Sequence, residues 1–326
     1  MRLMLCLAAG VVVLFVVSLL TGPAEIGARD SLRALVAGGD DPVAMVMREI
    51  RLPRALLALM IGGSLGLAGA AMQGYLRNPL ADPGLIGVSG SAALGAVLSI
   101  QTGVAGAVAF ALPASALAGA LIGVFAVLAL AGPRGSALTL ILAGIAISAL
   151  AGALTSLVLN LSPNPFAANE IVFWMMGSLA DRSMVHVGIA LPFIAIGAVM
   201  LARLARGLDA LTLGEDAAAA MGIDLKRLRL GLIVGTAAVV GASTAVAGAI
   251  GFVGLVVPHI LRPFVGARPG ALLWASTLGG AIMLLAADIA VRLILPERDL
   301  KLGVLTALVG APLFLHLIYS TRRDGL

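Results

Sequence analysis

The ionisable side chains of this 326-residue chain are few and scattered, which limits the chemistry that it can do. Asp288 is the one acidic residue inside a predicted membrane crossing, and Arg292 follows it one helical turn later. An ion-coupled carrier or an intramembrane enzyme needs several such groups together. Oppositely charged residues at i and i+4 of a helix face each other. We therefore expect Asp288 to pair with Arg292 and to play no catalytic or ion-coupling part.

Metal binding is not indicated either. His186, His259 and His316 lie near the ends of apolar stretches, where a histidine usually hydrogen-bonds to nearby groups of the chain. Met175 and Met176 belong to an amphipathic segment and are expected to pack against it. Cys6 is the only cysteine, which excludes an intrachain disulfide or a thiolate cluster. No metal site is expected.

The segment from Thr212 to Gly222 stands out because it reads as a short capped helix. Thr212 and Glu215 have the spacing of a capping box, four alanines with high helix propensity follow, and Gly222 suits a left-handed C-terminal residue. Basic residues on both sides place the segment in the cytosol by the positive-inside rule; they are Arg203, Arg206, Lys226, Arg227 and Arg229. We expect a rigid helix over about 213–221 that another protein grips.

The composition indicates an all-α polytopic membrane protein. Hydrophobic residues make up 61% of the chain and charged residues 11%, and the mean hydropathy is +1.12. The 41 glycines favour close packing of membrane helices. The net charge of +5 comes from cations at the ends of apolar stretches, which points to topology and lipid headgroups and not to nucleic acid.

Apolar stretches of roughly 20 residues predict ten crossings within a single membrane domain, 1–326. They lie at about 3–20, 52–74, 84–102, 105–131, 137–160, 185–205, 230–249, 251–266, 271–293 and 302–320. Residues 21–50 are expected outside the membrane, as is a surface helix at about 168–178 that carries Trp174. An even number of crossings puts both termini on one side, and the arginine-rich internal turns put that side in the cytosol. Several arginines then lie on the outer side, against the usual bias.

Motifs along the chain resemble the permease family of ABC importers for ferric siderophores, haem and cobalamin. The resemblance runs in one register from about residue 48 to the C-terminus. The motifs are Ile50-Arg-Leu-Pro-Arg54, Gly69-Ala-Ala-Met-Gln73, Asn78-Pro-Leu-Ala-Asp-Pro-Gly-Leu-Ile-Gly-Val-Ser89, Trp174-Met-Met-Gly177, Leu213-Gly-Glu215, Gly248-Ala-Ile-Gly-Phe-Val-Gly-Leu-Val-Val-Pro-His259 and Gly303-Val-Leu-Thr-Ala-Leu-Val-Gly-Ala-Pro312.

This resemblance implies a permease subunit of the bacterial inner membrane, with a fold like that of the cobalamin permeases. It further implies a homodimer, two separate ATPase subunits that bind ATP and Mg²⁺, and a periplasmic protein that delivers a metal chelate. The chain itself would be a transporter subunit, with no cofactor and no enzymatic activity. In agreement, it contains no Gly-x-x-x-x-Gly-Lys-Ser/Thr loop that could hold the phosphates of ATP.

The resemblance also assigns residues to three tasks. Coupling to the ATPase falls to Leu213, Gly214, Glu215, Asp216, Ala217, Met221 and Gly222. Docking of the binding protein falls to Arg51, Arg54 and Arg292. The translocation path and its cytosolic gate would include Asn78, Pro79, Leu80, Ala137, Leu138, Ser148 and Gly152. Other interpretations stay open, because arginines at span ends also bind lipid phosphates and small residues also serve helix packing.

The substrate expected is an iron chelate, either a ferric siderophore or haem. Ala137 and Leu138 stand where the cobalamin permeases have a Thr-Ser pair, so the constriction would be apolar here, but cobalamin remains the alternative substrate. A gradient-driven secondary transporter is a more distant alternative, disfavoured by the scarcity of buried ionisable groups.

Overall fold

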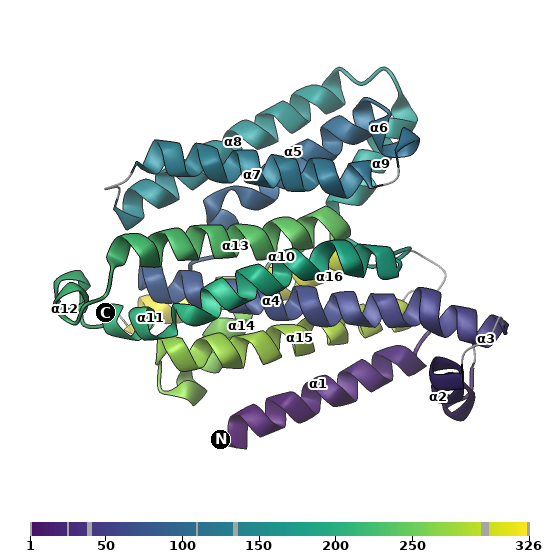
Figure 1. Cartoon of the computed structure of the whole chain (residues 1–326), viewed down its shortest axis with the longest axis horizontal. Coiled ribbons are helices and arrows are strands. Elements are labelled where there is room, and N and C mark those ends of the chain that lie inside the picture. Colours follow the sequence, from purple (N-terminus) through teal and green to yellow (C-terminus); the bar gives the residue numbers. More distant parts are fainter. Residues whose placement is uncertain are drawn as a thin grey trace.

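The computed structural model describes residues 2–24, 26–37, 41–108, 110–132, 136–294 and 300–324, and all regular structure within them is helical. Seven helices are long and apolar enough to cross a membrane, and three shorter apolar helices accompany them. The predicted all-α fold with about ten apolar helices is therefore confirmed (Figure 1). The ten are α1 (Arg2–Leu20), α4 (Leu52–Leu76), α5 (Val88–Gln101), α7 (Ala111–Ala131), α8 (Ala137–Asn160), α10 (Met184–Arg203), α13 (Leu225–Ala247), α14 (Val253–Leu261), α15 (Pro269–Ile294) and α16 (Leu302–Asp324).

Shorter helices cover the two ends of this bundle. One end, called here the α12 end, carries α11 (Ala205–Leu211), α12 (Glu215–Ala220) and η3 (Arg262–Val265). The opposite end, called the α9 end, carries α2 (Ala28–Ala37), α3 (Pro42–Met45), η1 (Val46–Arg51), α6 (Val104–Ala107) and α9 (Pro165–Met175). The 3₁₀ helix η2 (Pro83–Ile86) joins α4 to α5.

Glycines let the helices of the core touch backbone to backbone. A Cβ atom added to Gly62 or Gly66 of α4 would overlap the carbonyl of Gly280 or Ser276 on α15. Gly95 of α5 and Gly119 of α7 meet the opposite helix in the same way. Without a hydrophobic driving force between helices in lipid, such close contacts provide the packing energy.

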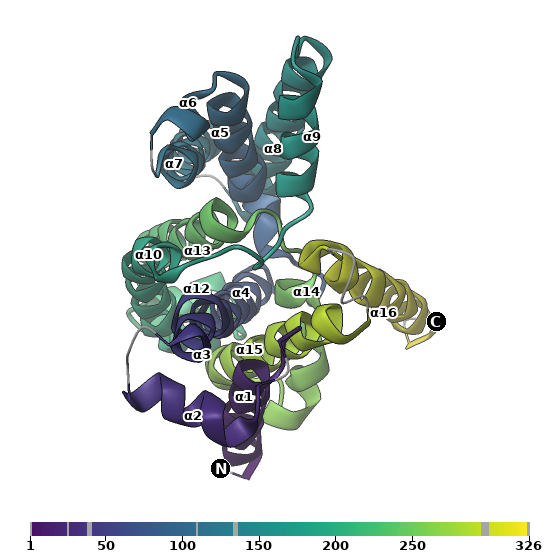
Figure 2. The same cartoon turned by 90° about the vertical axis from the view of Figure 1, so that its right-hand side faces the viewer.

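Three distant segments cross at the α9 end, as Figure 2 shows from that side. The residues after α9, the bend between α13 and α14, and the start of α16 are joined there by two backbone hydrogen bonds, Ser178 N–H to Ala247 O (2.8 Å) and Gly303 N–H to Gly177 O (3.2 Å). A Cβ atom on Gly177, Gly248 or Gly303 would overlap a carbonyl of a neighbouring segment. Three of the family motifs thus form a single junction.

The structure corrects the sequence prediction in the outer segments. Residues 28–37 and 42–51 form helices, whereas only an external stretch was expected. The surface helix starts at Pro165 and not near 168, because Asn164 caps it by accepting from the N–H of Phe166 and proline suits the first turn. Trp174 is 8% exposed, so its ring packs inward from α9 and does not lie at the membrane interface as predicted.

The junction predicts a sharp contrast between two glycines. In Gly303→Ala the added methyl group would collide with two carbonyls, those of Met176 and Ala249, whereas a methyl group on Gly251 meets no atom within 4 Å. We expect Gly303→Ala to lower stability by about 1–3 kcal/mol, the usual cost of overpacking, and Gly251→Ala to be neutral. Thermal unfolding in detergent measures both, and equal melting temperatures for the two variants would contradict the junction.

Candidate functional site: a protruding helix and a buried arginine cluster

The helix α12 is a well-terminated projection, although its N-terminal cap differs from the prediction. The hydroxyl of Thr212 donates to the carbonyl of Asp209 in α11 and caps nothing. Gly214 has φ 104°, which a helix does not allow. The helix therefore begins at Glu215 and is shorter than the expected 213–221. The predicted capping box of Thr212 and Glu215 is therefore wrong.

The C-terminal end of α12 follows the prediction. Gly222 has φ +84°, and two hydrogen bonds close a Schellman motif, Gly222 N–H to Ala219 O and Ile223 N–H to Ala218 O. Asp224 then caps α13 by accepting from the N–H groups of Lys226 and Arg227. The turn between α12 and α13 is thus held by hydrogen bonds on both sides.

The outer surface of α12 combines apolar and acidic groups. Leu213 is 68% exposed and Met221 62% exposed. Glu215 and Asp216 are exposed, Gly214 and Ala217 are half-buried, and Ala218 packs inward. Figure 1 shows α12 projecting beyond the ends of the long helices. Large apolar side chains on such a projection are typical of a protein interface.

The residues predicted for the path lie on two elements, the turn after α4 and the helix α8. Both the turn and the start of α8 lie at the α12 end. Asn78, Pro79 and Leu80 follow α4, where the side-chain oxygen of Asn78 accepts from the N–H of Leu80 (2.9 Å). The remaining four lie on α8, a helix at the edge of the bundle (Figure 1). Leu138 is 65% exposed and Gly152 is exposed, while Ala137 and Ser148 are half-buried. One side of α8 is therefore open in the single chain.

The three arginines predicted for docking lie together at the α9 end, around Asp288. The carboxylate of Asp288, fully buried, pairs with Arg292 (Nη2 to Oδ2, 2.8 Å) and with Arg54 (Nε to Oδ1, 2.8 Å). The expected pairing of Asp288 with Arg292 is confirmed. The second partner, Arg54, was not foreseen, because it lies 234 residues away in sequence.

Two of these arginines also hold the end of α1. Arg51, 3% exposed, donates to the carbonyls of Leu19, Leu20 and Ala24. Arg292 donates to the carbonyls of Ser18 and Thr21 and to the hydroxyl of Ser18. The last carbonyls of a helix lack intrahelical partners and carry partial negative charge. The C-terminal end of α1 thus offsets part of the positive charge that one carboxylate leaves uncompensated.

Two further cations at the α9 end contact other groups of the chain. Arg48 donates to the carbonyl of Leu35, near the last turn of α2. Lys301 lies over the ring of Phe173, 5.4 Å from its centre. Burial lowers the pKa of Arg182, and the neighbouring Asp181 partly offsets this shift. Arg48 and Lys301 thus contribute to the fold at this end.

Ligand groups for a metal ion do not gather in the described part of the chain. Among these residues no three histidine, cysteine, aspartate or glutamate side chains lie close enough together to hold an ion. His186 accepts a hydrogen bond from the N–H of Ser183 at the start of α10, which is a capping interaction. The arrangement thus has an exposed helix at one end and an ion cluster at the other.

Comparison with known proteins shows to which family the chain belongs. The model of the FecCD transport family matches residues 10–320. This chain belongs to the FecCD transport family. Curated relatives include the cobalamin import system permease protein BtuC of Halobacterium salinarum, 40% identical over 86% of this chain and 75% of the relative. The hemin transport system permease protein HmuU of Yersinia pestis is 37% identical over 99% of this chain and 97% of the relative.

A solved structure agrees with the FecCD assignment. It is described as an inward-facing conformation of a metal-chelate type ABC transporter, and it matches this chain with a TM-score of 0.87 and 33% identity. The match covers 98% of this chain and 99% of the other. The chain is thus a transport permease with the fold of FecCD members. The comparisons do not test the residues assigned to coupling, docking and the path, which stay predictions.

The stability of the protein is expected to depend on the carboxylate of Asp288. Asp288→Asn would leave the buried guanidinium of Arg292 and the half-buried one of Arg54 without their carboxylate, and breaking a buried pair costs about 3–5 kcal/mol. We expect a clear loss of thermal stability and faster amide hydrogen exchange at residues 18–24. The control is Arg268→Gln, since Arg268 is 76% exposed and only 3.8 Å from Asp209, and surface pairs contribute about 0–1 kcal/mol. Unchanged amide hydrogen exchange at residues 18–24 in Asp288→Asn would show that the ion cluster does not hold the end of α1.

Proposed function

We propose that this chain is the membrane permease of an ABC importer that moves an iron chelate, a ferric siderophore or haem, from the periplasm to the cytoplasm. ATP hydrolysis in a separate subunit drives the movement. The proposal is supported by membership of the FecCD family over residues 10–320, and by relatives whose names refer to hemin and cobalamin transport. Cobalamin is the alternative substrate, favoured by the relative of Halobacterium salinarum.

The functional unit in this proposal is a homodimer in the bacterial inner membrane. The open side of α8, with Leu138, Leu142 and Ile145 exposed, is the surface that a second copy would cover. The path then runs between the two copies along α8, past Ser148 and Gly152. The α12 end faces the cytosol, with both termini on that side, in keeping with the basic residues that flank α12.

ATP hydrolysis reaches the membrane helices through α12. An ATPase subunit binds the exposed side chains of Leu213 and Met221 and the acidic first turn of α12. Because the Schellman motif and the Asp224 cap join α12 to α13, displacement of α12 shifts a helix of 23 residues. By the rise per residue this helix reaches roughly 35 Å, so the displacement arrives at the junction of Gly248 at the α9 end.

A periplasmic binding protein docks at the α9 end in this proposal. Arg51, Arg54 and Arg292 remain its predicted contacts, but their guanidinium groups now face Asp288 and the end of α1. To dock a partner, these arginines would have to give up their hydrogen bonds to the α1 carbonyls and bind carboxylates of the partner instead. Charged contacts of this kind orient a partner and speed its association, and they weaken with salt.

Uptake by reconstituted vesicles tests the proposed function. The permease is reconstituted with its ATPase and binding protein, and accumulation of radioactive haem, a ferric siderophore or cobalamin is followed. We expect accumulation of one iron chelate only with ATP inside, and none when the Walker lysine of the ATPase is replaced. Uphill uptake by the permease alone would sink the proposal, and uptake of cobalamin alone would select the alternative substrate.

The α12 surface generates a separate prediction. Leu213→Asp places a charge on a side chain that is 68% exposed, so the fold should tolerate it. Loss of an apolar anchor at the centre of an interface costs about 2 kcal/mol or more, and we expect ATPase binding to weaken at least about tenfold, with uptake falling in parallel. Leu161→Asp, equally exposed at the α9 end (69%), is the control. Binding is measured by sedimentation or surface plasmon resonance. Equal affinities for the two variants would rule out α12 as the contact.

A further inference from the structure

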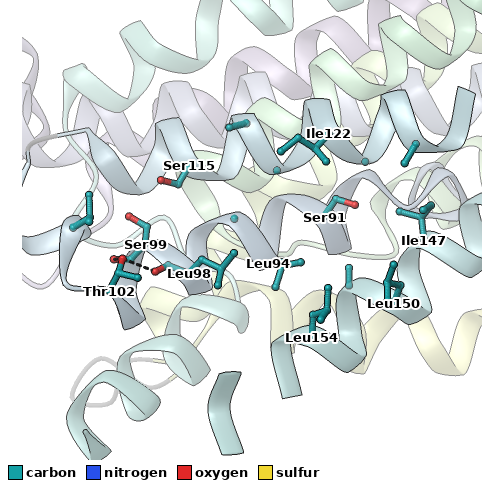
Figure 3. A pocket seen from close by; sticks show the side chains of 17 residues that line it. Ser91, Leu94, Leu98, Ser99, Thr102, Ser115, Ile122, Ile147, Leu150 and Leu154 are labelled. Atoms are coloured by element: carbon teal, nitrogen blue, oxygen red, sulfur yellow. Dashed lines mark hydrogen bonds between the residues drawn. The ribbon is translucent and has the colours of Figure 1, made fainter. Parts of the chain in front are cut away.

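A long groove lies between α8 and the pair α5–α7. Its volume is about 490 Å³, and it is lined by side chains of all three helices (Figure 3). The sticks in Figure 3 show Leu94 and Leu98 of α5, Ile122 of α7, and Leu150 and Leu154 of α8 around it. In Figure 1, α8 diverges from α7 toward the α9 end, so the groove is a wedge between splayed helices.

The groove opens sideways onto the outer surface of the bundle. Ile122 is 70% exposed, Leu150 56% and Leu98 46%, although all three line the groove. None of the three belongs to the face of α8 assigned to a second copy, and an exposed apolar side chain of a membrane-spanning fold otherwise faces lipid and not water. Whatever fills the groove therefore enters from the membrane side.

The dimensions favour a single hydrocarbon chain as the occupant. The lining residues on α5 extend from Ser91 to Thr102, a rise of roughly 17 Å. Over this length the groove encloses about 490 Å³, less than half of the roughly 1,300 Å³ that a cylinder 10 Å across would fill. An α-helix of a second copy, about 10–12 Å across, is too thick for such a slot. A chain of methylene groups fits, since carbon atoms pack at about 3.5–4 Å.

The hydroxyl group of Ser99 at one end of the groove favours a ligand that carries oxygen atoms. Ser99 is 4% exposed, lines the groove, and its hydroxyl has no hydrogen-bond partner among the described residues. Thr102 and Ser115 add two more hydroxyl groups at the same end, as Figure 3 shows. A buried hydroxyl without a partner is costly, and a carbonyl oxygen of a ligand at this position would satisfy it.

We propose that this groove binds one acyl chain of a membrane glycerophospholipid. The chain lies along α5 toward Ile147, and an ester carbonyl accepts a hydrogen bond from Ser99. The bound chain fills the wedge and supports α8 in its splayed position. The proposal rests on the membrane fold alone and not on the transported substrate or on the ATPase.

A photoreactive lipid tests this site. The purified permease is placed in vesicles of phosphatidylethanolamine and phosphatidylglycerol that contain a phosphatidylcholine with a diazirine on one acyl chain. After illumination, mass spectrometry maps the labelled peptides. We expect labels to concentrate on groove residues such as Leu94, Ile147 and Leu154. The experiment needs no ATPase, binding protein or substrate, so its failure leaves the proposed function untouched.

Two matched variants make the result decisive. Ala118 and Ala114 are both exposed on α7, but only Ala118 lines the groove. Ala118→Phe should lower groove labelling by about tenfold, the ratio that two lost buried methylene groups produce, whereas Ala114→Phe should leave it unchanged. Ser99→Ala, which keeps the groove open, should shift the label along the groove. Equal labelling of both phenylalanine variants, or labels spread evenly over the outer face of α7, would mean ordinary annular lipid. A cross-link from a photoreactive residue at position 122 to a second copy would likewise overturn the proposal.

Discussion

Close contact between helix backbones, made at glycines, is the constraint on which the rest of this structure depends. In lipid there is no gain from burying apolar surface between helices, so packing must come from short contacts over many atoms. The most extensive of these contacts joins α4 to α15 through Gly62, Gly66 and Gly280. Gly69 brings α4 against Gly254 of α14, and Gly197 brings α10 against Gly235 of α13. No side chain larger than hydrogen fits at these points, so the core behaves as a rigid body.

The parts outside this core are those that the proposed function needs to move. The helix α8 packs against η2 and α5, where Gly144 contacts the backbone of Leu85 and Gly90 lies beside Ala151, while a wedge separates it from α7 toward the α9 end. The N-terminal helix α1 packs along α15 and is held at its C-terminal end by the arginine cluster, while α12 projects from the start of α13. A tightly packed core with a projecting helix at one end and an edge helix beside a groove can pass a displacement at one end on to the other.

The sequence predicted the fold class, the apolar helices and the pairing of Asp288 with Arg292, because each depends on local spacing or composition. It failed where tertiary contacts decide. Thr212 was predicted to cap α12, but its hydroxyl finds the carbonyl of Asp209 first. Trp174 was placed at the membrane interface, but the Gly177–Gly248 crossing draws it inward. The role of the outer arginines as partners of helix carbonyls depends on α1, α4 and α15 meeting, which no spacing within one helix reveals.

The central claim is that an ATP-hydrolysing partner moves α8 of two facing copies through α12. One spin label on Leu138→Cys, in a Cys6→Ser background, reports the distance between the copies at the start of α8, since Leu138 is 65% exposed. Pulsed dipolar spectroscopy should give one distance for the permease with its nucleotide-free ATPase and a different one when ATP is bound and not hydrolysed. A Leu213→Asp permease should give a single distance in both conditions. If the permease with an unsubstituted α12 gave the same distance with and without nucleotide, or no dipolar signal at all, the account would be contradicted.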